Sequence, residues 1–564
     1  MAHHIQVDRR QPLWLPSLII VFVGLLCVLP LARLAVVGIS ALWNGGTAAI
    51  LTDLAVWQAV RNTLITACLG TGLSLAIGCL FGFLLTLTNI PKKGLLSFLF
   101  VLPMMIPPQV TALAWVQMFG PSSALLKMLH LAPPLGSKQP LYSISGISLL
   151  YGFQHAPLVY LALRATLMSL PREAIEAARI SGASGWRAFC DIIIPLALPG
   201  IIAGAAISFV SCTGNFGIPA ILGIPASIYT LSTLIFTKFS AFTGTTFGEV
   251  ALISAMIAAI SITGLFVQDR ALRGRDYRIL GITGSIAAFD IGPFKRLAVS
   301  VLALLLAFIL VGPFFALLAA SLVPAYGVAL TWQSFSLGAY YEVIFRQAVT
   351  KTAFINSLGL AAGAAICLLI ISVFTAYLLT KRRDRFSRFI AACIEVPYSL
   401  PGIVVAISFI LLLAAPLPFF KVKLYGTIWI IFIAYLSTFY AVSLKPVFSA
   451  FRQLDPALEE AAQLAGAGIG RRMSTIIVPL IAPAAGASVI LVFLIACNEL
   501  TVSALLWSAG TQTLGVVIYN LDDSGSANLA SALSVLVVMM VAGLMLGLDY
   551  LARWLPRGVV PWKS

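Results

Sequence analysis

Charged residues are scarce in this chain. Only 10% of its 564 residues are Asp, Glu, Lys or Arg, whereas soluble domains carry about 25%. This scarcity, with a mean hydropathy of +1.03, excludes an ordinary soluble protein. The apolar stretches are continuous over about 20 residues or more, which excludes the alternating pattern of barrel strands. The expected fold class is an all-α membrane protein with about twelve transmembrane helices.

Residues that bind metals or carry covalent chemistry are also few. There are four His and eight Cys, with no C-x-x-C pair and no cluster at metal-ligand spacing. No G-x-x-x-x-G-K-[ST] phosphate loop occurs either. We therefore expect no catalytic residue, no metal site and no cofactor of the chain's own, and any ATP must bind to another polypeptide.

The net charge of +16 does not indicate nucleic acid, because the basic residues lie in short clusters between apolar spans. With the N-terminus in the cytoplasm, 26 of the 35 Lys and Arg fall on the cytoplasmic side and 9 on the other. Positive residues are retained inside. The sequence thus predicts a multi-pass protein of the bacterial inner membrane, in contact with lipid, with both termini cytoplasmic.

The apolar spans fall into two similar halves. A first membrane domain is predicted over 1–267, a cytoplasmic linker over 268–298 and a second membrane domain over 299–564. Six spans are expected in each, at about 16–42, 58–88, 95–118, 146–168, 197–221, 246–267, 299–323, 354–380, 388–414, 425–448, 481–505 and 529–550. Asn62-Thr63-Leu64 recurs as Asn356-Ser357-Leu358. Because six is even, the halves enter the membrane the same way round, as parallel repeats.

A loop between the fourth and fifth spans occurs in both halves. It reads PREAIEAARISGASGWRAFCDIIIPLALPG in 171–200 and DPALEEAAQLAGAGIGRRMSTIIVPLIAPA in 455–484. Each copy predicts a short helix after a proline, a sharp turn at Gly182 or Gly466, and a second helix that ends at a proline where the fifth span begins. Such a projecting helix suits the groove of another protein. A helix lying on lipid headgroups is the alternative, disfavoured by its Ala and Glu faces.

Both copies resemble the EAA motif of type I ABC importer permeases, and the resemblance extends over about residues 50–550. It implies the fold of that family in two fused copies, coupling helices that bind two copies of an ATPase subunit, and a periplasmic solute-binding protein as a further partner. The coupling residues that it implies are Glu176, Ala177, Ala178, Gly182, Glu460, Ala461, Ala462 and Gly466.

Polar groups inside the spans are costly and are candidates for the translocation path. Asn215, Asn498 and Glu499, in the fifth spans, are the first choice, although a helix–helix hydrogen bond is an equal alternative. Glu395 is expected to be a buried carboxylate with a packing or gating role. Prolines 103, 107, 108, 397 and 401 are expected to kink or break the third helix of each half. Asn62 and Asn356 are expected to hold neighbouring helices together.

The stretch Gly-Asn-Phe-Gly-Ile-Pro-Ala in 214–220 resembles ferric-iron and 2-aminoethylphosphonate importers, a branch that also reaches thiamine and polyamine systems. Iron(III) is the expected solute and 2-aminoethylphosphonate the closest alternative. A secondary transporter with twelve helices is a further alternative, but it gives no reason for the duplicated loop. A membrane enzyme would need a catalytic cluster, which is not evident.

Overall fold

The computed structural model describes residues 14–43, 52–134, 136–170, 176, 180–182, 184–241, 246–272, 289–382, 384–415 and 423–551. Helices make up nearly all of these residues, which contain no strand beyond an isolated bridge between Thr88 and Phe289. Ala177 and Ala178 lie outside the described residues, as does most of the predicted linker.

The first half contains helices α1 (Trp14–Val23), α2 (Leu29–Trp43), α4 (Leu54–Leu87), α5 (Lys93–Met105), α6 (Pro108–Met118), α7 (Ala124–Met128), α8 (Ile144–Met168), α10 (Gly185–Ala188), α11 (Ile194–Gly214), α12 (Gly217–Leu222), α13 (Leu231–Ser240) and α14 (Thr246–Leu272). The second half contains α15 (Phe294–Leu306), α16 (Gly312–Ser321), α17 (Gly338–Tyr341), α18 (Ala348–Lys381), α19 (Arg385–Ser399), α20 (Gly402–Leu413), α21 (Ile428–Gln453), α22 (Pro456–Leu464), α23 (Ile469–Arg472), α24 (Val478–Cys497), α25 (Ser503–Leu506), α26 (Leu514–Asp523) and α27 (Ala527–Leu551).

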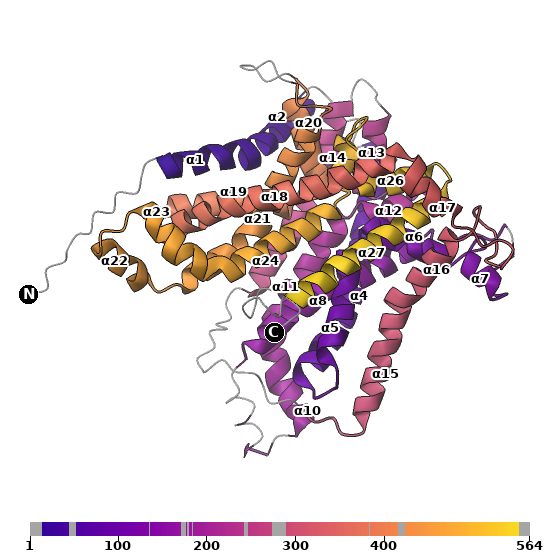
Figure 1. The fold of residues 1–564 in the computed structure, drawn as a ribbon, viewed down its shortest axis with the longest axis horizontal. Helices are drawn as coiled ribbons and strands as arrows, with labels where there is room; N and C mark the ends of the chain where they lie inside the picture. The colour runs from indigo at the N-terminus through magenta and orange to yellow at the C-terminus, as the bar shows by residue number, and fades with distance from the viewer. Residues whose placement is uncertain are drawn as a thin grey trace, which may run out of the picture.

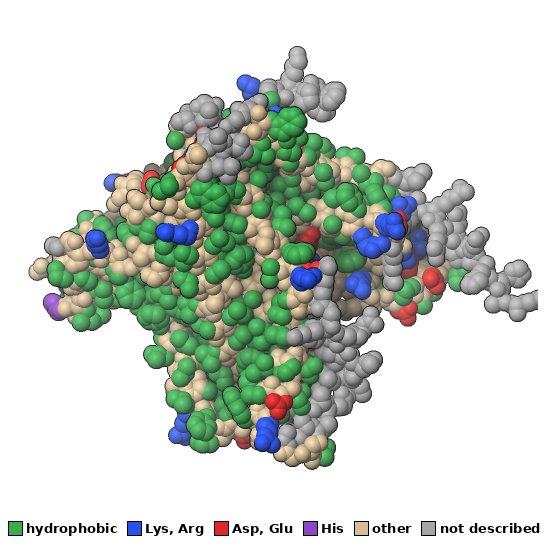
Figure 2. Space-filling model, turned by 180° about the vertical axis from the view of Figure 1, so that it is seen from behind, with side chains coloured by type: hydrophobic (Ala, Val, Ile, Leu, Met, Phe, Trp, Pro, Cys, Tyr) green, Lys and Arg blue, Asp and Glu red, His purple; other side chains and the backbone are tan. Residues whose placement is uncertain are grey.

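Ten helices of the described chain are long and apolar enough to cross a membrane, and two bent pairs bring the number to twelve. The pairs are α5 with α6, bent by 101°, and α19 with α20, bent by 108°. The bends lie at Pro107 and Pro401, so the prediction of broken third helices is confirmed. The broad middle of the face in Figure 2 is largely hydrophobic, as a lipid-facing surface requires.

The bent pair of the first half makes one complete crossing. The Ser97 hydroxyl, near the start of α5, lies 2.7 Å from the Tyr160 hydroxyl, late in α8. The carbonyl of Val116, near the end of α6, accepts a hydrogen bond from Gln139, just before α8. Since α8 itself crosses the molecule, α5 and α6 together connect its two ends. In the second half, α19 and α20 both pack on α21, and counting each bent pair as one span gives the predicted six spans in each half.

The halves are interlocked by their first spans. Helix α1 packs on α18 and α19, and α2 packs on α20, all in the second half. The Ser437 hydroxyl on α21 donates to the Leu26 carbonyl at 2.8 Å. Conversely, α15 and α16 of the second half pack on α5 and α6 of the first. The first span of each half therefore packs partly against helices of the other half.

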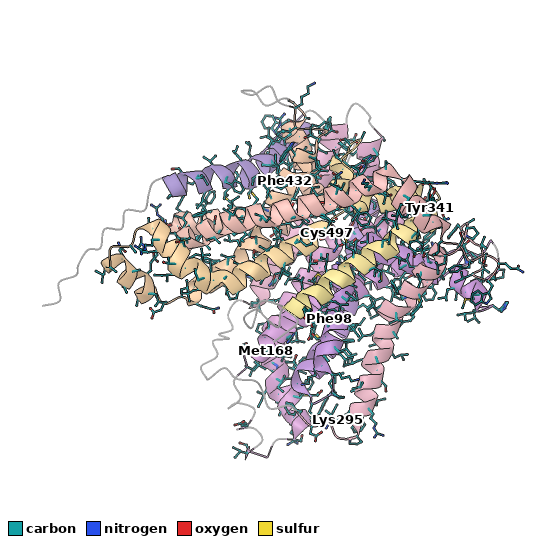
Figure 3. The ribbon with its side chains drawn as sticks, in the orientation of Figure 1. Phe98, Met168, Lys295, Tyr341, Phe432 and Cys497 are labelled. Atoms are coloured by element: carbon teal, nitrogen blue, oxygen red, sulfur yellow. The ribbon has the colours of Figure 1, made fainter. Side chains whose placement is uncertain are left out.

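The molecule has two ends that differ in the elements they carry. The motif end carries α10 and α22, and the opposite end carries α7, α13, α17 and α26 (Figure 1). In Figure 3, Lys295, on α15, lies at the motif end, next to the helices of the first half. Tyr341 lies at the opposite end, and Cys497 lies near the middle. In Figure 1 the helices that lead to α10 and those that lead to α22 diverge towards the motif end.

Equivalent hydrogen bonds confirm the internal repeat. In the first half, Asn62 Nδ2 donates to the Tyr229 carbonyl and the Thr63 hydroxyl accepts from the Leu231 amide. In the second half, Asn356 Nδ2 donates to the carbonyls of Gly510 and Gln512. Both asparagines thus hold the segment before α13 or α26 against the second span, as predicted.

The fifth spans differ from the prediction at both ends. Each begins earlier, because the second loop helix continues into it through a π-helical turn, at Phe189–Ile193 and at Met473–Ile477. The second loop helix was expected to end at a proline, Pro195 in the first half and Pro479 in the second, and this was wrong. Each proline lies in the first turn of the α-helix that follows the π turn, where a missing amide is tolerated. Each span also ends earlier, at Gly214 and Cys497.

Candidate coupling loops and translocation pathway

The second loop copy forms the predicted helix and turn. The Asp455 carboxylate accepts a hydrogen bond from the Ala457 amide at 2.9 Å and caps the N-terminus of α22. Gly466 has φ +83°, in the left-handed region that favours glycine. Its amide donates to the Gln463 carbonyl, and the Ala467 amide donates to that of Ala462. These two bonds end the helix and redirect the chain into α23.

A polar network that was not predicted attaches this loop to the membrane helices. Glu459 is 12% exposed and pairs with Lys381 at 2.7 Å and with Arg472 at 3.3 Å. The Tyr377 hydroxyl donates to the same carboxylate at 2.8 Å, and Arg472 also donates to Gln463. Two cations and a phenol therefore hold one carboxylate of α22. The only sequence signal was the doubled glutamate in E-E-A-A.

The adjacent Glu460 points away from this network. Glu460 and Ala461 are exposed, Ala462 is half-buried, and Gly466 is exposed at the turn. Leu464, an apolar residue on the same helix, is 77% exposed. Of the two neighbouring carboxylates, Glu459 is committed to the protein itself and Glu460 is available to a partner.

The first loop copy has the same turn but a different anchor. Gly182 has φ +82°, and Glu176 lies exposed in a helical turn. Ile180, the counterpart of Leu464, is 87% exposed. Among the described residues of this loop the anchoring contact is apolar: Phe189 packs edge-on against Phe83 of α4, with ring centroids 5.1 Å apart. Ala188 is buried where the second half has Arg472.

Asn215 and Glu499 occupy equivalent positions after the fifth spans. The Asn215 side chain accepts from the Ile218 amide at 3.1 Å, at the start of α12. The Glu499 carboxylate accepts from the amides of Val502 and Ser503 at 2.6 and 3.1 Å, at the start of α25. Both side chains therefore cap a short helix. These bonds account for the breaks in the fifth spans, where a continuous helix was predicted.

Asn498 joins the two halves. Its Nδ2 donates to the Met105 carbonyl at 2.6 Å, at the bend of the first half's broken helix. The equivalent residue in the first half, Gly214, approaches the bend of the second half: a Cβ on it would lie 3.3 Å from the Cα of Pro401. The end of each fifth span thus contacts the broken helix of the other half, near mid-depth. The assignment of Asn215, Asn498 and Glu499 to the path remains a prediction.

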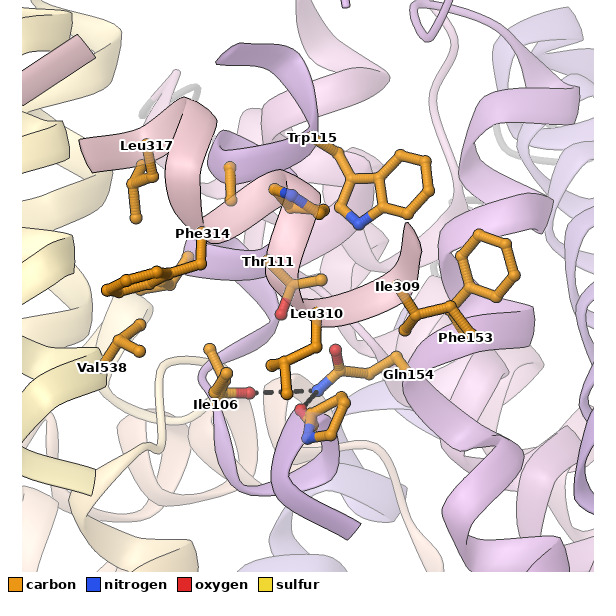
Figure 4. A pocket seen from close by; sticks show the side chains of 14 residues that line it. Ile106, Thr111, Trp115, Phe153, Gln154, Ile309, Leu310, Phe314, Leu317 and Val538 are labelled. Atoms are coloured by element: carbon orange, nitrogen blue, oxygen red, sulfur yellow. Dashed lines mark hydrogen bonds between the residues drawn. The ribbon is translucent and has the colours of Figure 1, made fainter. Parts of the chain in front are cut away.

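The bend in the first half has its own polar support. Gln154 Nε2 donates to the carbonyls of Pro103 and Ile106, both at 3.0 Å (Figure 4). The Pro103 carbonyl also accepts from the Ile106 amide at 3.2 Å, but Pro107, four residues on, has no amide to offer it. Phe314 and Ile309, from the second half, line the adjacent cavity. The broken helix is thus held by α8 on one side and by the other half on the other.

Glu395 is not buried among helices, so that prediction was wrong. Its side chain is 46% exposed and pairs with Lys445 of α21 at 2.5 Å. Lys445 also lies over the ring of Tyr398 at 5.0 Å. Because α19 presents one polar face along its length, the carboxylate is directed along the helix surface rather than into the packed interior.

Comparison with known proteins gives matches in both halves. Residues 74–276 and 369–561 match the family described as binding-protein-dependent transport system inner membrane component. Over 531 residues the chain is 26% identical to the probable ABC transporter permease protein y4fN of Sinorhizobium fredii (strain NBRC 101917 / NGR234), covering 93% of this chain and 89% of that protein.

Other similar proteins differ in the solute they are named for. The chain is 24% identical over 452 residues to the ferric transport system permease protein FbpB of Actinobacillus pleuropneumoniae, covering 78% of this chain and 64% of that one. It is 30% identical over 225 residues to the molybdenum transport system permease protein ModB of Escherichia coli (strain K12), covering 38% and 93%. A solved bacterial ABC transporter for alginate import shows 17% identity and a TM-score of 0.38, covering 46% of this chain and 97% of that chain.

Proposed function

Because this chain belongs to the binding-protein-dependent transport system inner membrane components and is an ABC importer permease subunit, we propose that its two fused halves form the complete membrane pathway of an ATP-driven importer. It has the type I importer permease fold in two copies and resides in the membrane as a multi-pass protein. The ATPase and the periplasmic solute-binding protein are separate partners in this proposal. The family match leaves no support for a secondary transporter.

The two loops at the motif end are the ATPase-docking surfaces in this proposal. The carrying observation is that Ile180 and Leu464, at equivalent positions, are apolar yet 87% and 77% exposed. Exposed apolar side chains beside a fixed turn are typical of a surface completed by a partner. Glu176 and Glu460 supply an exposed carboxylate next to each. Two loops imply two ATPase copies, and the motif end is then cytoplasmic, as are both termini.

The docking proposal is tested by Ile180→Glu combined with Leu464→Glu. A charge in each apolar contact is expected to prevent the ATPase from copurifying with the chain. Trp332→Glu is the matched control, because Trp332 is 98% exposed but lies in the loop at the opposite end. Undiminished copurification with the double variant would contradict the docking assignment.

Iron(III) is the solute that we propose, with 2-aminoethylphosphonate as the alternative and thiamine or a polyamine after it. The similarity to a ferric permease across both halves supports the first choice. The test is ATP-dependent uptake into vesicles that contain the chain, its ATPase and its binding protein. Uptake of iron(III) is expected to exceed that of the other solutes, and a preference for any of them would replace iron in the proposal.

A further inference from the structure

A cavity between the halves, at the opposite end, is lined by acidic and phenolic side chains. Its volume is about 200 Å³, and it is bounded by α12 and the end of α6 in the first half and by α26 and the start of α27 in the second. The polar residues among its lining are Gln117, Tyr142, Tyr326, Tyr519, Asp522 and Asp523. None of the residues that line it is Lys, Arg, His or Cys.

The two carboxylates have no cationic partner. Neither Asp522 nor Asp523 pairs with a Lys or Arg among the described residues, whereas Asp53 at the same end is paired with Lys238 at 3.0 Å. Asp522 is half-buried in the cavity wall, directly beside Asp523. Two adjacent carboxylates repel each other when both are ionised, and a cation bound between them relieves this repulsion.

The phenols come from three separate segments and converge on the carboxylates. Tyr519, on α26, is held by ring contacts with Phe216 and Phe236 at 6.0 and 5.8 Å. Tyr142 precedes α8 and Tyr326 follows α16. The two aspartates supply the negative charge of the cavity, and the phenols supply neutral oxygen atoms.

A second, independent feature also indicates a ligand. Gln117 is only 2% exposed, and its Nε2 has no hydrogen-bond partner. A buried amide without a partner costs about 1–3 kcal/mol. Gln117 lines the cavity, so a small shift of its amide when a cation binds would bring it to the metal or to one of the metal's waters.

We propose that this cavity is a binding site for a hard metal cation, with Asp522 and Asp523 as charged ligands and the three tyrosines and Gln117 completing an oxygen-rich shell. Hard cations prefer carboxylate, carbonyl and water oxygens, and a site without a basic residue disfavours oxyanions such as molybdate. The role of the site rests on the proposed function, because the opposite end is then the entrance from the periplasm. A solute released there by a binding protein would meet these groups first.

The binding site is tested on the purified, detergent-solubilised full-length chain with terbium(III), a hard trivalent ion whose emission is sensitised by nearby tyrosine. Saturable emission is expected, displaced by iron(III) citrate but not by sulfate. Asp522→Asn combined with Asp523→Asn is expected to weaken terbium binding at least about tenfold. The matched control is Glu342→Gln, because Glu342 lies at the same end and is paired with Arg346. Equal terbium affinity in the aspartate variant, or displacement by sulfate, would overturn the site.

Uptake measurements separate this inference from the proposed function. If the site is on the pathway, the aspartate variant is expected to raise the KM for ATP-dependent iron(III) uptake while ATPase copurification is unchanged. Loss of terbium binding with unchanged iron uptake would refute the entrance role. Intact terbium binding in a chain that imports only 2-aminoethylphosphonate would instead remove iron from the proposed function while the cation site stands.

Discussion

The two motif loops share a motif and a turn, yet their described residues are attached to the membrane helices by contacts of different kinds. In the second half, a carboxylate on α22 is held by Lys381 and Arg472. In the first half, Phe189 packs on Phe83, and Ala188 takes the position of the arginine. The exposed faces remain alike, because Ile180 and Leu464 project in both.

This difference shows which part of the duplicated motif is constrained by the partner and which by the fold. Two identical ATPase copies require two similar docking faces, so the exposed residues and the glycine turn recur. The inner face packs against this chain rather than a partner, and there the described contacts are ionic in one loop and apolar in the other. An ionic anchor responds to salt and to loss of one charge, whereas an apolar anchor does not.

The largest effect is expected where the loops are alike. Valine at both Gly182 and Gly466 places a β-branched residue at φ +82° and +83°, which costs at least about 1–2 kcal/mol at each position. The turns would open and ATP-dependent uptake would be abolished, while the amount of chain in the membrane is unchanged. Gly468→Val is the control, since Gly468 has φ −64° and open space around it. Normal transport by the double variant would refute the coupling assignment.

The second largest effect is expected in the ionic anchor alone. Glu459→Gln leaves Arg472, whose side chain is 10% exposed, without its counter-charge. Removing one partner of a buried pair costs about 3 kcal/mol. Hydrogen exchange of the amides in 456–472 should accelerate strongly in this variant, and that in 184–193 should not.

Glu460→Gln is the matched control for that measurement, because Glu460 is exposed beside Glu459. It should leave amide exchange in 456–472 unchanged and weaken ATPase copurification. Adding Arg472→Met to the Glu459→Gln variant should restore part of the protection, because the unpaired charge is then gone. Equal exchange in both glutamine variants would show that the ion pairs contribute nothing to the anchor.

Much of the architecture could be predicted from the sequence, because it follows from local chemistry. Continuous apolar runs predict the spans, Asp455 with its proline predicts the start of α22, and Gly466 predicts its end. The internal ion pairs of Glu459 could not be predicted, since they depend on where α18 brings Lys381, and Glu460 was named only through the family resemblance. The breaks after Gly214 and Cys497 were missed for a similar reason: they are stable because polar side chains cap new short helices within an otherwise apolar run.

A smaller effect is expected in the apolar anchor. Phe189 is half-buried, so Phe189→Ala should cost about 2 kcal/mol through lost contact with Phe83. Amide exchange in 184–193 should rise and that in 456–472 should not, the reverse of the Glu459→Gln result. Arg187→Ala is the control, because Arg187 is exposed on α10, the short helix directly before Phe189, and removal of its side chain should change exchange little. A larger effect for Arg187 than for Phe189 would place the anchor on the wrong residue.

The smallest effect separates the two anchors without any mutation. Raising the salt concentration from about 0.1 M to about 1 M shortens the screening length from about 10 Å to about 3 Å. Lys381 is 36% exposed, so its attraction to Glu459 should weaken by about 0.5 kcal/mol, whereas packing of Phe189 is not weakened by salt. Amide exchange should therefore accelerate about twofold in 456–472 and stay constant or slow in 184–193. Acceleration of equal size in both loops would mean that the anchors do not differ in kind, because a purely ionic contribution cannot act where the contact is between aromatic rings.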